Sequence, residues 1–585
     1  MSNESTPGKN KFAFATVTSL FFMWGFITCL NDLLIPKFKT DFDLNQLQAN
    51  TVQSAFFGAY FLISLIYFLI SAAKGDPINR IGYKNGLILG LIISGIGCAM
   101  FYPAAQIYKF WLFLAALSVL GAGVTIIQIA ANPYVTILGP EKSGSSRLNL
   151  SQGFCSLGYV IAPFIGGILI FGSEVFDSPE LETSIAKETT AQFQTFIEET
   201  EKAFLSVDPD SETAFQFTPK GQKSQDPFDE SSRILSDVTE KEKGLDMNAA
   251  NQLRLASKTL LETQEVEGVL SPLAKQSFEK GNAIVRRLQL EELDSLKAPY
   301  LGLGAAFFLI ALIFKFISLP TFTQEGKIEP GITAFKHKHF VWGWLAIFFY
   351  VGSEVTIGSI LVNYLGDPSV ASLPENEADK YLSFCWGGVM IGRLIGAISL
   401  GEMKESKKLP YMILAAVVST LIIYACATFK QLLTVGEHIN PVDILPFIGL
   451  IALSFLFFKL GKSSAGKMVG LFALVAATLT IFSMSTRGDY ALWSILGIGL
   501  FNSIMWSNIF SLSIKGLGKD TSQGSSLLVM MIVGGALMPL AQGWLTDSYG
   551  IRGSLGIVLL GYVYLVWYGF YAPKAKETPE EALAA

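Results

Sequence analysis

Charged side chains are scarce in this sequence. Asp, Glu, Lys and Arg make up 16% of its 585 residues, whereas soluble proteins carry about 25%. The shortage is greatest in long apolar runs, such as residues 12–35, 86–100 and 301–319. Each run approaches the roughly 20 residues that a helix needs to cross hydrocarbon. Such runs recur almost to the C-terminus, which excludes a large soluble core.

Histidine and cysteine are also rare, and their positions exclude the usual metal and redox motifs. The three histidines lie in polar segments, and the five cysteines are scattered through apolar runs without a CxxC pair. The apolar runs contain no HExxH motif, no Asp-rich metal motif and no Ser/Lys dyad. We therefore expect no cofactor, no metal site built from His or Cys, and no enzymatic reaction.

The apolar runs predict an all-α membrane protein. Backbone groups in lipid must be satisfied within helices or a closed barrel, and these runs are continuous rather than alternating. We therefore expect a helical bundle with roughly fourteen spans. Lys and Arg gather in alternate short loops, all on one face of this bundle. The positive-inside rule then predicts a multi-pass protein with both termini in the cytoplasm.

One long segment, residues 173–297, differs in kind from the apolar runs. It holds 25 acidic and 14 basic residues, and its second part, from about residue 247, shows helical periodicity. It follows an outward-running span, so we expect it on the extracytoplasmic side. We interpret it as a solvated helical cap or a partly disordered loop. A module that binds a partner or captures substrate is the alternative.

A basic turn occurs twice, which suggests two related halves. Residues 75–84 read GDPINRIGYK after the second span, and residues 392–396 read GRLIG at the end of the eighth. Related halves are typical of alternating access, and we assign Asn79, Arg80 and Arg393 to a cytoplasmic gate. The predicted order is helices 1–5 (1–172), the acidic insert (173–297), helix 6 (298–320), an inter-bundle loop (321–338), a second bundle (339–573) and a cytoplasmic tail (574–585).

Two carboxylates fall within apolar runs. Asp32 lies in the outer part of the first span and Glu354 near the middle of the seventh. An ionisable residue is costly in hydrocarbon and is a functional candidate by default. A carboxylate there can take up a proton or offer oxygen ligands to Na⁺, so we predict that both couple transport to an ion. The simpler interpretations are a helix-end position for Asp32 and a hydrogen-bonded link between helices for Glu354.

Uncharged polar side chains also gather in the apolar runs. Gln128 and Asn132 are spaced i, i+4, so both amides share one helix face. An amide both donates and accepts hydrogen bonds, as sugar hydroxyls require, but amides also join helices in membranes. Tryptophans such as Trp24 could stack on a sugar ring, although they more often pack. The candidate substrate-binding residues are Asn31, Gln128, Asn132, Gln152, Asn363, Trp386, Asn502, Trp506 and Asn508.

Several long motifs resemble the fucose and glucose/galactose permease family of the major facilitator superfamily. They are FFMWGFITCLNDLLIPKF (21–38), QSAFFGAYF (53–61), AANPYVTILGPE (130–141), RLNLSQGF (147–154), FYVGSEVTIGSILVNYL (349–365) and SSLLVMMIVGGALMPLAQGWLTD (525–547). The resemblance covers nearly all of the apolar part but not residues 173–297. It implies two six-helix bundles around a central sugar cavity, and sugar symport driven by an ion gradient.

The resemblance is closer to the glucose/galactose branch. Fucose permeases carry Glu, Gln and Arg where this sequence has Gln128, Glu354 and Asn363. Asp32 matches the helix-1 aspartate that family members use in coupling or sugar binding. Because Gln128 replaces the helix-4 glutamate and Glu354 adds a carboxylate on helix 7, our hypothesis is that the second coupling carboxylate has moved from helix 4 to helix 7. Helix 10 departs from the branch, because it reads FNSIMWSNIFSL where FNSIMFPTIFSL is usual. This departure leaves the particular sugar open.

Two spans exceed the twelve of the family. Segments at about 441–460 and 467–484 are expected to form an extra helix pair between helices 9 and 10. Which of the three segments between 411 and 484 is helix 9 stays open.

The combined expectation is a monomeric secondary transporter in the lipid bilayer of a bacterial inner membrane, with no nucleic-acid partner. It would import a glucose- or galactose-type hexose together with H⁺ or Na⁺. The alternatives are symport of L-fucose or an N-acetylated hexosamine, and, in another class, a transporter-like receptor that acts through the insert.

Overall fold

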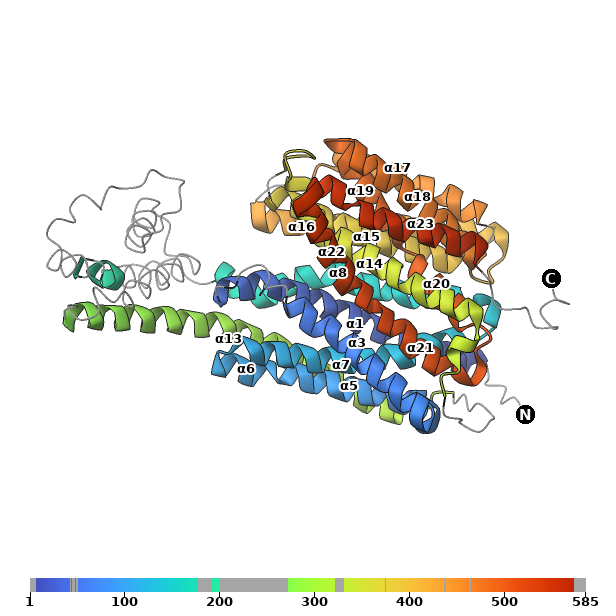
Figure 1. The fold of residues 1–585 in the computed structure, drawn as a ribbon, viewed down its shortest axis with the longest axis horizontal. Helices are drawn as coiled ribbons and strands as arrows, with labels where there is room; N and C mark the ends of the chain where they lie inside the picture. The colour runs from blue at the N-terminus through green and yellow to red at the C-terminus, as the bar shows by residue number, and fades with distance from the viewer. Residues whose placement is uncertain are drawn as a thin grey trace.

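The computed structural model describes residues 7–42, 44, 48, 51–176, 191–196, 198–199, 272–320, 331–373, 375–435, 438–461 and 464–572. Within these residues the regular structure is helical, and there is no strand. The helices run along the long axis of one bundle (Figure 1). The predicted all-α fold is confirmed.

The first half of the bundle contains the N-terminal helices. They are α1 (Pro7–Asp41), α3 (Thr51–Lys74), the short α4 (Pro77–Ile81), α5 (Tyr83–Ala99) with its continuation α6 (Phe101–Ile107), α7 (Phe110–Ile137), α8 (Gly144–Phe176) and α13 (Pro272–Phe316). Helix α1 packs along α8, α3 packs along α7, and α5 lies between α7 and α13.

The second half contains all later helices. They are α14 (Lys338–Gly366), α15 (Glu375–Ser399), α16 (Glu405–Val435), α17 (Leu445–Leu460), α18 (Ala465–Ser485), α19 (Asp489–Asn502) with α20 (Met505–Ile514), α21 (Thr521–Met530) with α22 (Gly534–Ser554), and α23 (Gly556–Tyr571). Helix α14 packs against α15, α20, α22 and α23, which places it at the centre of this half.

Twelve helical stretches among the described residues are long and apolar enough to cross a membrane. Helix α8, with 33 residues, and the apolar α23, with 16, lie beside them in the same bundle (Figure 1). Together they account for the spans expected from the apolar runs.

Small residues allow the helices of the first half to approach closely. A Cβ atom built on Gly90 would lie 2.8 Å from the carbonyl oxygen of Gly123, and one built on Gly158 would lie 2.6 Å from the amide nitrogen of Phe26. Both separations are far inside van der Waals contact, so a larger residue would push the helices apart. Such contacts replace the hydrophobic effect as the source of helix association in lipid.

The packing identifies the helix that completes the second bundle. In the first half, the third span α5 lies against the fourth (α7) and the sixth (α13). In the second half, α18 lies in the same way against α19 and α20 and against the last helix, α23. We therefore assign α18 as the ninth helix. On this assignment the extra pair is α16 and α17, and it precedes the ninth helix instead of following it.

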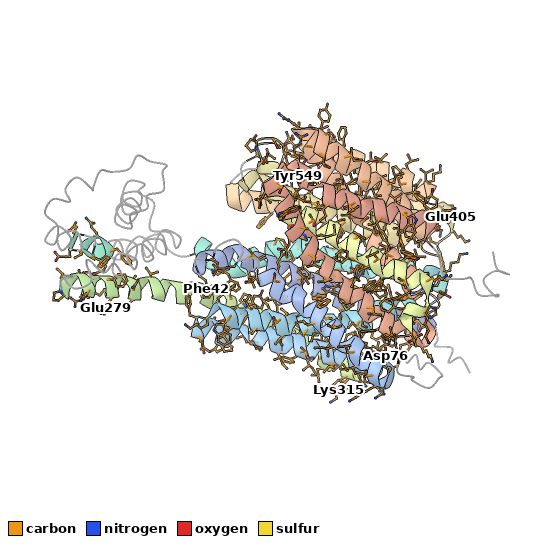
Figure 2. All side chains as sticks on the ribbon, viewed as in Figure 1. Phe42, Asp76, Glu279, Lys315, Glu405 and Tyr549 are labelled. Carbon is orange, nitrogen blue, oxygen red and sulfur yellow. The ribbon has the colours of Figure 1, made fainter. Side chains whose placement is uncertain are left out.

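The bundle has two distinct ends. Helix α1 begins and α23 ends at one of them, here called the terminal end (Figure 1). Asp76 and Glu405 lie at the terminal end, whereas Phe42 and Glu279 lie toward the opposite, distal end (Figure 2). The start of α1 and the end of α23 therefore share one face of the bundle, as an even number of spans requires.

Helix α13 extends far beyond the bundle at the distal end (Figure 1). It begins at Pro272, so the helical periodicity near the end of the insert belongs to the same helix as the sixth span. The stretch of this helix that can cross a membrane is Leu296–Phe316, close to the predicted limits of 298–320. Residues 191–196 pack on this extension, where the rings of Phe196 and Phe278 are 5.1 Å apart. The remainder of the insert lies outside the described residues, as does the loop at 321–330.

Candidate functional site

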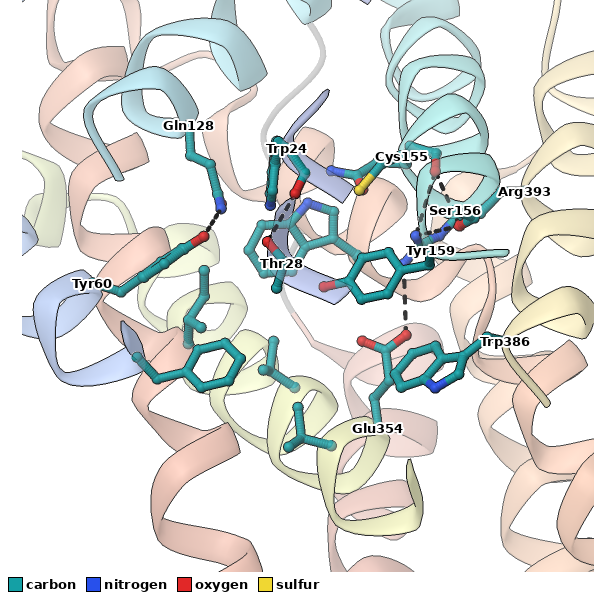
Figure 3. Close-up of a pocket in the computed structure, with 16 residues that line it drawn as sticks. Trp24, Thr28, Tyr60, Gln128, Cys155, Ser156, Tyr159, Glu354, Trp386 and Arg393 are labelled. Carbon is teal, nitrogen blue, oxygen red and sulfur yellow. Dashed lines mark hydrogen bonds and ion pairs between the residues drawn. The ribbon is translucent and has the colours of Figure 1, made fainter. Parts of the chain in front are cut away.

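A cavity of about 110 Å³ lies between the two halves, near the middle of the bundle. Helices α1, α3, α7 and α8 form its wall on one side, and α14, α15, α20 and the turn before α22 form the other (Figure 3). Pockets between helices of a bundle are a common place for a small ligand. The polar residues of its wall are the candidates for recognition.

Glu354 and Arg393 form an ion pair in the wall of this cavity. Oε1 of Glu354 lies 3.6 Å from Nη2 of Arg393, and the side chains are 13% and 8% exposed. The hydroxyl of Tyr350, one turn before Glu354 on α14, donates a hydrogen bond of 2.6 Å to the same Oε1. A carboxylate buried in this way needs its charge compensated, and Arg393 supplies the opposite charge.

Arg393 also joins three helices. Its Nη1 donates to Oγ of Ser156 at 2.7 Å and to the carbonyl oxygen of Gln152 at 3.4 Å, both on α8 of the other half. Its Nε donates to the carbonyl oxygen of Ser503, just before α20. The prediction that Arg393 lies with Arg80 at a cytoplasmic gate is therefore wrong in position. Helix α15 continues from Arg393 to Ser399, which leaves Arg393 buried in the cavity wall.

Three polar groups of the cavity wall have no hydrogen-bond partner among the described residues. Gln128 donates through Nε2 to the Tyr60 hydroxyl at 2.9 Å, but its Oε1 accepts no hydrogen bond. The side-chain Nε2 of Gln152 and the indole Nε1 of Trp506 are likewise buried without a partner. A buried polar group that stays unpaired costs about 1–3 kcal/mol. These groups are therefore positioned to bind a polar ligand.

Aromatic rings enclose the same cavity. The ring of Trp386 on α15 stacks on Tyr159 of α8, with centroids 5.5 Å apart and an interplanar angle of 20°. Trp24 and Trp506 also line the cavity. These flat apolar faces beside hydrogen-bonding groups suit a ring that carries hydroxyl groups.

Several predicted substrate residues lie outside the cavity wall. The Oδ1 of Asn502 accepts from the Tyr562 hydroxyl at 2.9 Å, and that of Asn508 accepts from Nδ2 of Asn149 at 3.2 Å. These amides join helices. Asn31 is buried, with its Oδ1 3.5 Å from the Tyr300 hydroxyl. Neither the oxygen nor the nitrogen of the Asn132 amide has a partner in the described part of the chain, although the residue is fully buried.

Two further predicted residues need separate mention. Asn363 is exposed near the distal end of α14, at some distance along the helix from Glu354. Asp32 belongs to α1 and follows Asn31, but its side chain lies outside the described residues. Its predicted part in coupling therefore stays a prediction.

Sequence reasoning missed several cavity residues. Tyr350 and Ser156 lie one helical turn from Glu354 and Gln152, respectively, so i, i+4 spacing from the known candidates would have found both. Tyr60 lies within the QSAFFGAYF motif, but nothing in that motif marks its hydroxyl as a partner of Gln128.

Hydrogen bonds between the halves gather at the terminal end. Nδ2 of Asn79 donates to the carbonyl oxygen of Lys519 at 3.1 Å, and the hydroxyl oxygens of Tyr83 and Ser522 are 3.2 Å apart. Asp76 caps α4 by accepting from the Asn79 amide at 3.1 Å, and it also accepts from the Tyr67 hydroxyl. Arg80 is exposed. Burial raises the pKa of the Asp76 carboxyl above its usual value.

Gln523 on α21 connects the segment before α14 to the helices at the terminal end. Its Oε1 accepts from the amides of Thr333 and Ala334, each at 3.1 Å. Its Nε2 donates to the carbonyl oxygen of Gly331 and to Oγ of Ser71 on α3. One side chain thus joins both halves and the connecting segment. The structure therefore holds the two halves together on the terminal side of the cavity.

Known proteins share this sequence and this arrangement. The family model of the Major Facilitator Superfamily matches residues 12–176. A glucose/galactose transporter of Brucella abortus biovar 1 is 33% identical over 98% of both chains, and a putative glucose/galactose transporter of Helicobacter pylori strain 26695 is 29% identical over 97% of this chain and 98% of the relative.

The fold comparison agrees. The crystal structure of the transporter FucP in the outward conformation superimposes with a TM-score of 0.60 at 24% identity, over 96% of this chain and 99% of that one. The resemblance seen in the sequence motifs is thereby confirmed. With 33% identity along nearly its whole length to such a relative, this chain belongs to the major facilitator superfamily and, within it, to the fucose and glucose/galactose permease family.

Proposed function

We propose that this protein imports a monosaccharide by symport with H⁺ or Na⁺. The observation that carries the proposal is the cavity between the halves, where the ion-paired Glu354 lies beside the unpartnered groups of Gln128, Gln152 and Trp506. Two relatives are named glucose/galactose transporters, and a third, 27% identical over 92% of this chain, is the L-fucose-proton symporter of Escherichia coli. A hexose of the glucose or galactose type is the favoured substrate.

The cavity wall accounts for sugar recognition. A sugar hydroxyl can donate to Oε1 of Gln128 and accept from Nε2 of Gln152 and from Nε1 of Trp506. Each such bond removes the cost of a buried unpaired group. Trp386 and Trp24 provide apolar faces for the C–H surface of the ring. L-fucose and an N-acetylated hexosamine remain alternatives, because these contacts are common to many sugars.

Glu354 is the proposed coupling residue within this cavity. When it binds H⁺ or Na⁺ its negative charge is compensated, and the attraction for Arg393 weakens. Arg393 then keeps only its neutral partners on α8 and before α20. Cation binding on α14 would thereby change a contact between the halves, which is what coupled transport requires. Asp32 is proposed as a second ion-binding residue.

Alternating access would require the terminal end to open. The bonds from Asn79 to Lys519 and from Tyr83 to Ser522 would break in that step, because each joins the two halves. Asn79 and the exposed Arg80 are therefore proposed as gate residues. Arg393 is proposed to act deeper, at the cavity.

The remaining features of the proposal follow from the arrangement of the chain. We propose a bacterial inner-membrane protein, monomeric, with the terminal end in the cytoplasm and the long extension of α13 outside. We also propose the domain limits predicted from the sequence, with the addition that the helix of the sixth span begins at Pro272, within the insert. A receptor that acts through the insert is the competing class.

Counterflow in proteoliposomes tests the transport proposal. Vesicles loaded with unlabelled glucose, galactose, L-fucose or N-acetylglucosamine would be diluted into the labelled sugar, and net uptake would be measured separately with a proton gradient and with a sodium gradient. Saturable exchange of at least one sugar, with accumulation under one gradient, is expected. No exchange of any sugar by a monodisperse protein would remove the proposed function and favour the receptor.

A further inference from the structure

A second, apolar cavity lies between the two extra helices, α16 and α17. Its volume is about 690 Å³, within the roughly 300–1,000 Å³ of sites that hold drug-sized ligands. The lining residues run from Leu409 to Tyr424 on α16 and from Ile448 to Phe455 on α17. Pro441 and Ile444, in the short turn before α17, complete the lining. The cavity is separate from the sugar site, and its wall shares no residue with it.

The cavity exists because the two helices pack on other partners. Helix α16 packs along α15, and α17 packs chiefly against α19, while the two share little contact with each other. Inside a bilayer the space between them cannot be left empty, because lining atoms without neighbours lose their dispersion contacts. Water is a poor filler as well, since a buried water needs polar partners.

The hydroxyl donors of this wall are already used within the protein. Thr420 and Tyr424 are the hydroxyl residues of the lining. Oγ1 of Thr420 donates to the carbonyl oxygen of Ala416 at 2.8 Å, and the Tyr424 hydroxyl donates to that of Ile439 at 2.7 Å. Neither hydroxyl therefore has a proton left to donate to a sugar or to water, and the rest of the lining is apolar. A hydrocarbon chain is the occupant that matches this wall.

The two ends of the groove differ. At the distal end, the Tyr424–Ile439 hydrogen bond draws the end of α16 to the segment before α17, and the exposed carboxylate of Asp443 lies nearby in sequence. A transmembrane helix from a second copy would need the groove open at both ends. An acyl chain needs only one open end. From Leu409 to Tyr424 the groove runs about 22 Å along the helix axis, which exceeds one leaflet of a hydrocarbon core about 30 Å thick.

Basic residues mark the terminal end of the groove. Lys459 is exposed and lies one turn beyond the lining residue Phe455, on the same face of α17. Lys404 and Lys407 are exposed just before Leu409, where α16 begins. Glu405 also lies there, but it is paired with Lys408 at 2.7 Å. Basic residues between helices at a membrane surface attract anionic lipid headgroups.

We propose that the groove between α16 and α17 binds an anionic phospholipid of the leaflet on the terminal side. One acyl chain fills the apolar groove, and the phosphate lies near Lys459. The lipid thereby fixes the extra helix pair to the transporter core. This proposal does not depend on which sugar is carried, or on whether any sugar is carried.

Lipid binding can be measured on the full-length protein by native mass spectrometry. The purified protein would be titrated with phosphatidylglycerol and, separately, with phosphatidylcholine of the same chains. Wild-type protein should bind one phosphatidylglycerol with a clear preference over phosphatidylcholine. Lys459→Gln should lower that preference about fivefold, the effect of one lysine at a lipid surface. Lys467→Gln, which removes an exposed lysine at the start of α18, should leave it unchanged.

A pair of tryptophan variants tests the groove itself. Ala452→Trp places a large ring in the groove, whereas Leu453→Trp places the same ring on the neighbouring exposed position outside the lining. Only Ala452→Trp should abolish the bound lipid, with both variants monodisperse. Equal binding of both lipids by the wild type, or loss of lipid in both variants, would overturn the proposal. So would a dimer that Ala452→Trp dissociates, because the groove would then hold a second copy. If Ala452→Trp does not fold, the lipid preference of Lys459→Gln still decides the question, because an unchanged preference would contradict the proposal.

Discussion

The carboxylate of Glu354 is held between two partners that lie on different helices. Tyr350, on the same helix, donates to Oε1 at 2.6 Å, and Arg393, on the next helix, lies 3.6 Å from the same atom. Arg393 reaches on to Ser156 in the opposite half of the protein. A change in the charge of Glu354 therefore changes its attraction for Arg393, the residue that also contacts the opposite half.

Glu354→Gln should separate sugar exchange from accumulation. Glutamine keeps the size of the side chain but can neither take up a proton nor offer a charged ligand to Na⁺. We expect counterflow to persist and gradient-driven uptake to fall to simple equilibration. Glu405→Gln, at an exposed carboxylate of α16, is the matched control and should accumulate sugar normally. Undiminished accumulation by Glu354→Gln would show that Glu354 does not couple.

The same ion pair predicts a pattern of stabilities. Removing one partner of a buried pair leaves an uncompensated charge and typically costs about 3–5 kcal/mol, whereas removing both is often close to neutral. Glu354→Gln should therefore lower the thermal unfolding temperature, and adding Arg393→Gln should restore part of the loss. Thermal unfolding of the two single variants and the double variant in detergent measures this. Additive losses would mean that the two residues do not interact.

Part of this site could be predicted from the sequence, because burying a charge in an apolar run is conspicuous. Glu354 was found in that way. Its pairing with Arg393 could not be found, since it depends on the rotation and depth of two helices that the sequence leaves free. Asn502 illustrates the same limit. Its amide looked as suitable for a sugar as that of Gln152, yet it faces Tyr562, while Gln152 faces the cavity.

The number of spans was predictable for a similar reason, and their roles were not. Hydropathy and length identify α16, α17 and α18 equally well as membrane helices. Only packing separates them, because α18 lies against α19 and α23 whereas α16 and α17 lie at the outside of the half. A single sequence carries no signal of that difference.

Trp506→Phe should weaken sugar binding with little effect on the fold. Phenylalanine retains an aromatic ring beside Phe510 but lacks the indole N–H, which has no partner within the part of the chain that the structure describes. A neutral hydrogen bond contributes about 0.5–1.5 kcal/mol, so the KM of uptake should rise about 2- to 10-fold. Trp342→Phe, at a partly exposed ring that contacts Trp567, is the control. An unchanged KM would remove Trp506 from the binding site.

Asp76 should give the protein a pH-dependent stability. Burial raises the pKa of its carboxyl above the ordinary value of 3.8, so between 3.8 and the raised value the folded protein binds more protons than the unfolded chain. The free energy of unfolding must then fall as pH rises through this window and level off above it. Asp76→Asn should flatten that fall, while Asp489→Asn, at an exposed carboxylate, should retain it. Thermal unfolding between pH 4 and 8 provides the measurement, and identical profiles for wild type and Asp76→Asn would contradict the argument.

Gln523 should control access to the cavity from the terminal end. Its side chain satisfies the amides of Thr333 and Ala334 and bonds to Ser71, so Gln523→Ala would leave buried groups unpaired at about 1–3 kcal/mol each. The closed end should then open more often. Cys155, a buried cysteine of the cavity wall, serves as the reporter.

The measurement is the rate at which a membrane-impermeant maleimide, added on the terminal side of proteoliposomes, labels Cys155. The rate should rise several-fold in Gln523→Ala, and Cys155→Ser in the same background identifies the labelled site. Gln542→Ala is the matched control, because Gln542 is also buried and hydrogen-bonded but bonds within its own half to Thr546 and Ser554. If both glutamine variants label at the wild-type rate, the contacts around Gln523 do not limit opening. If both label faster, the effect is a general loosening of the bundle and Gln523 is not a gate.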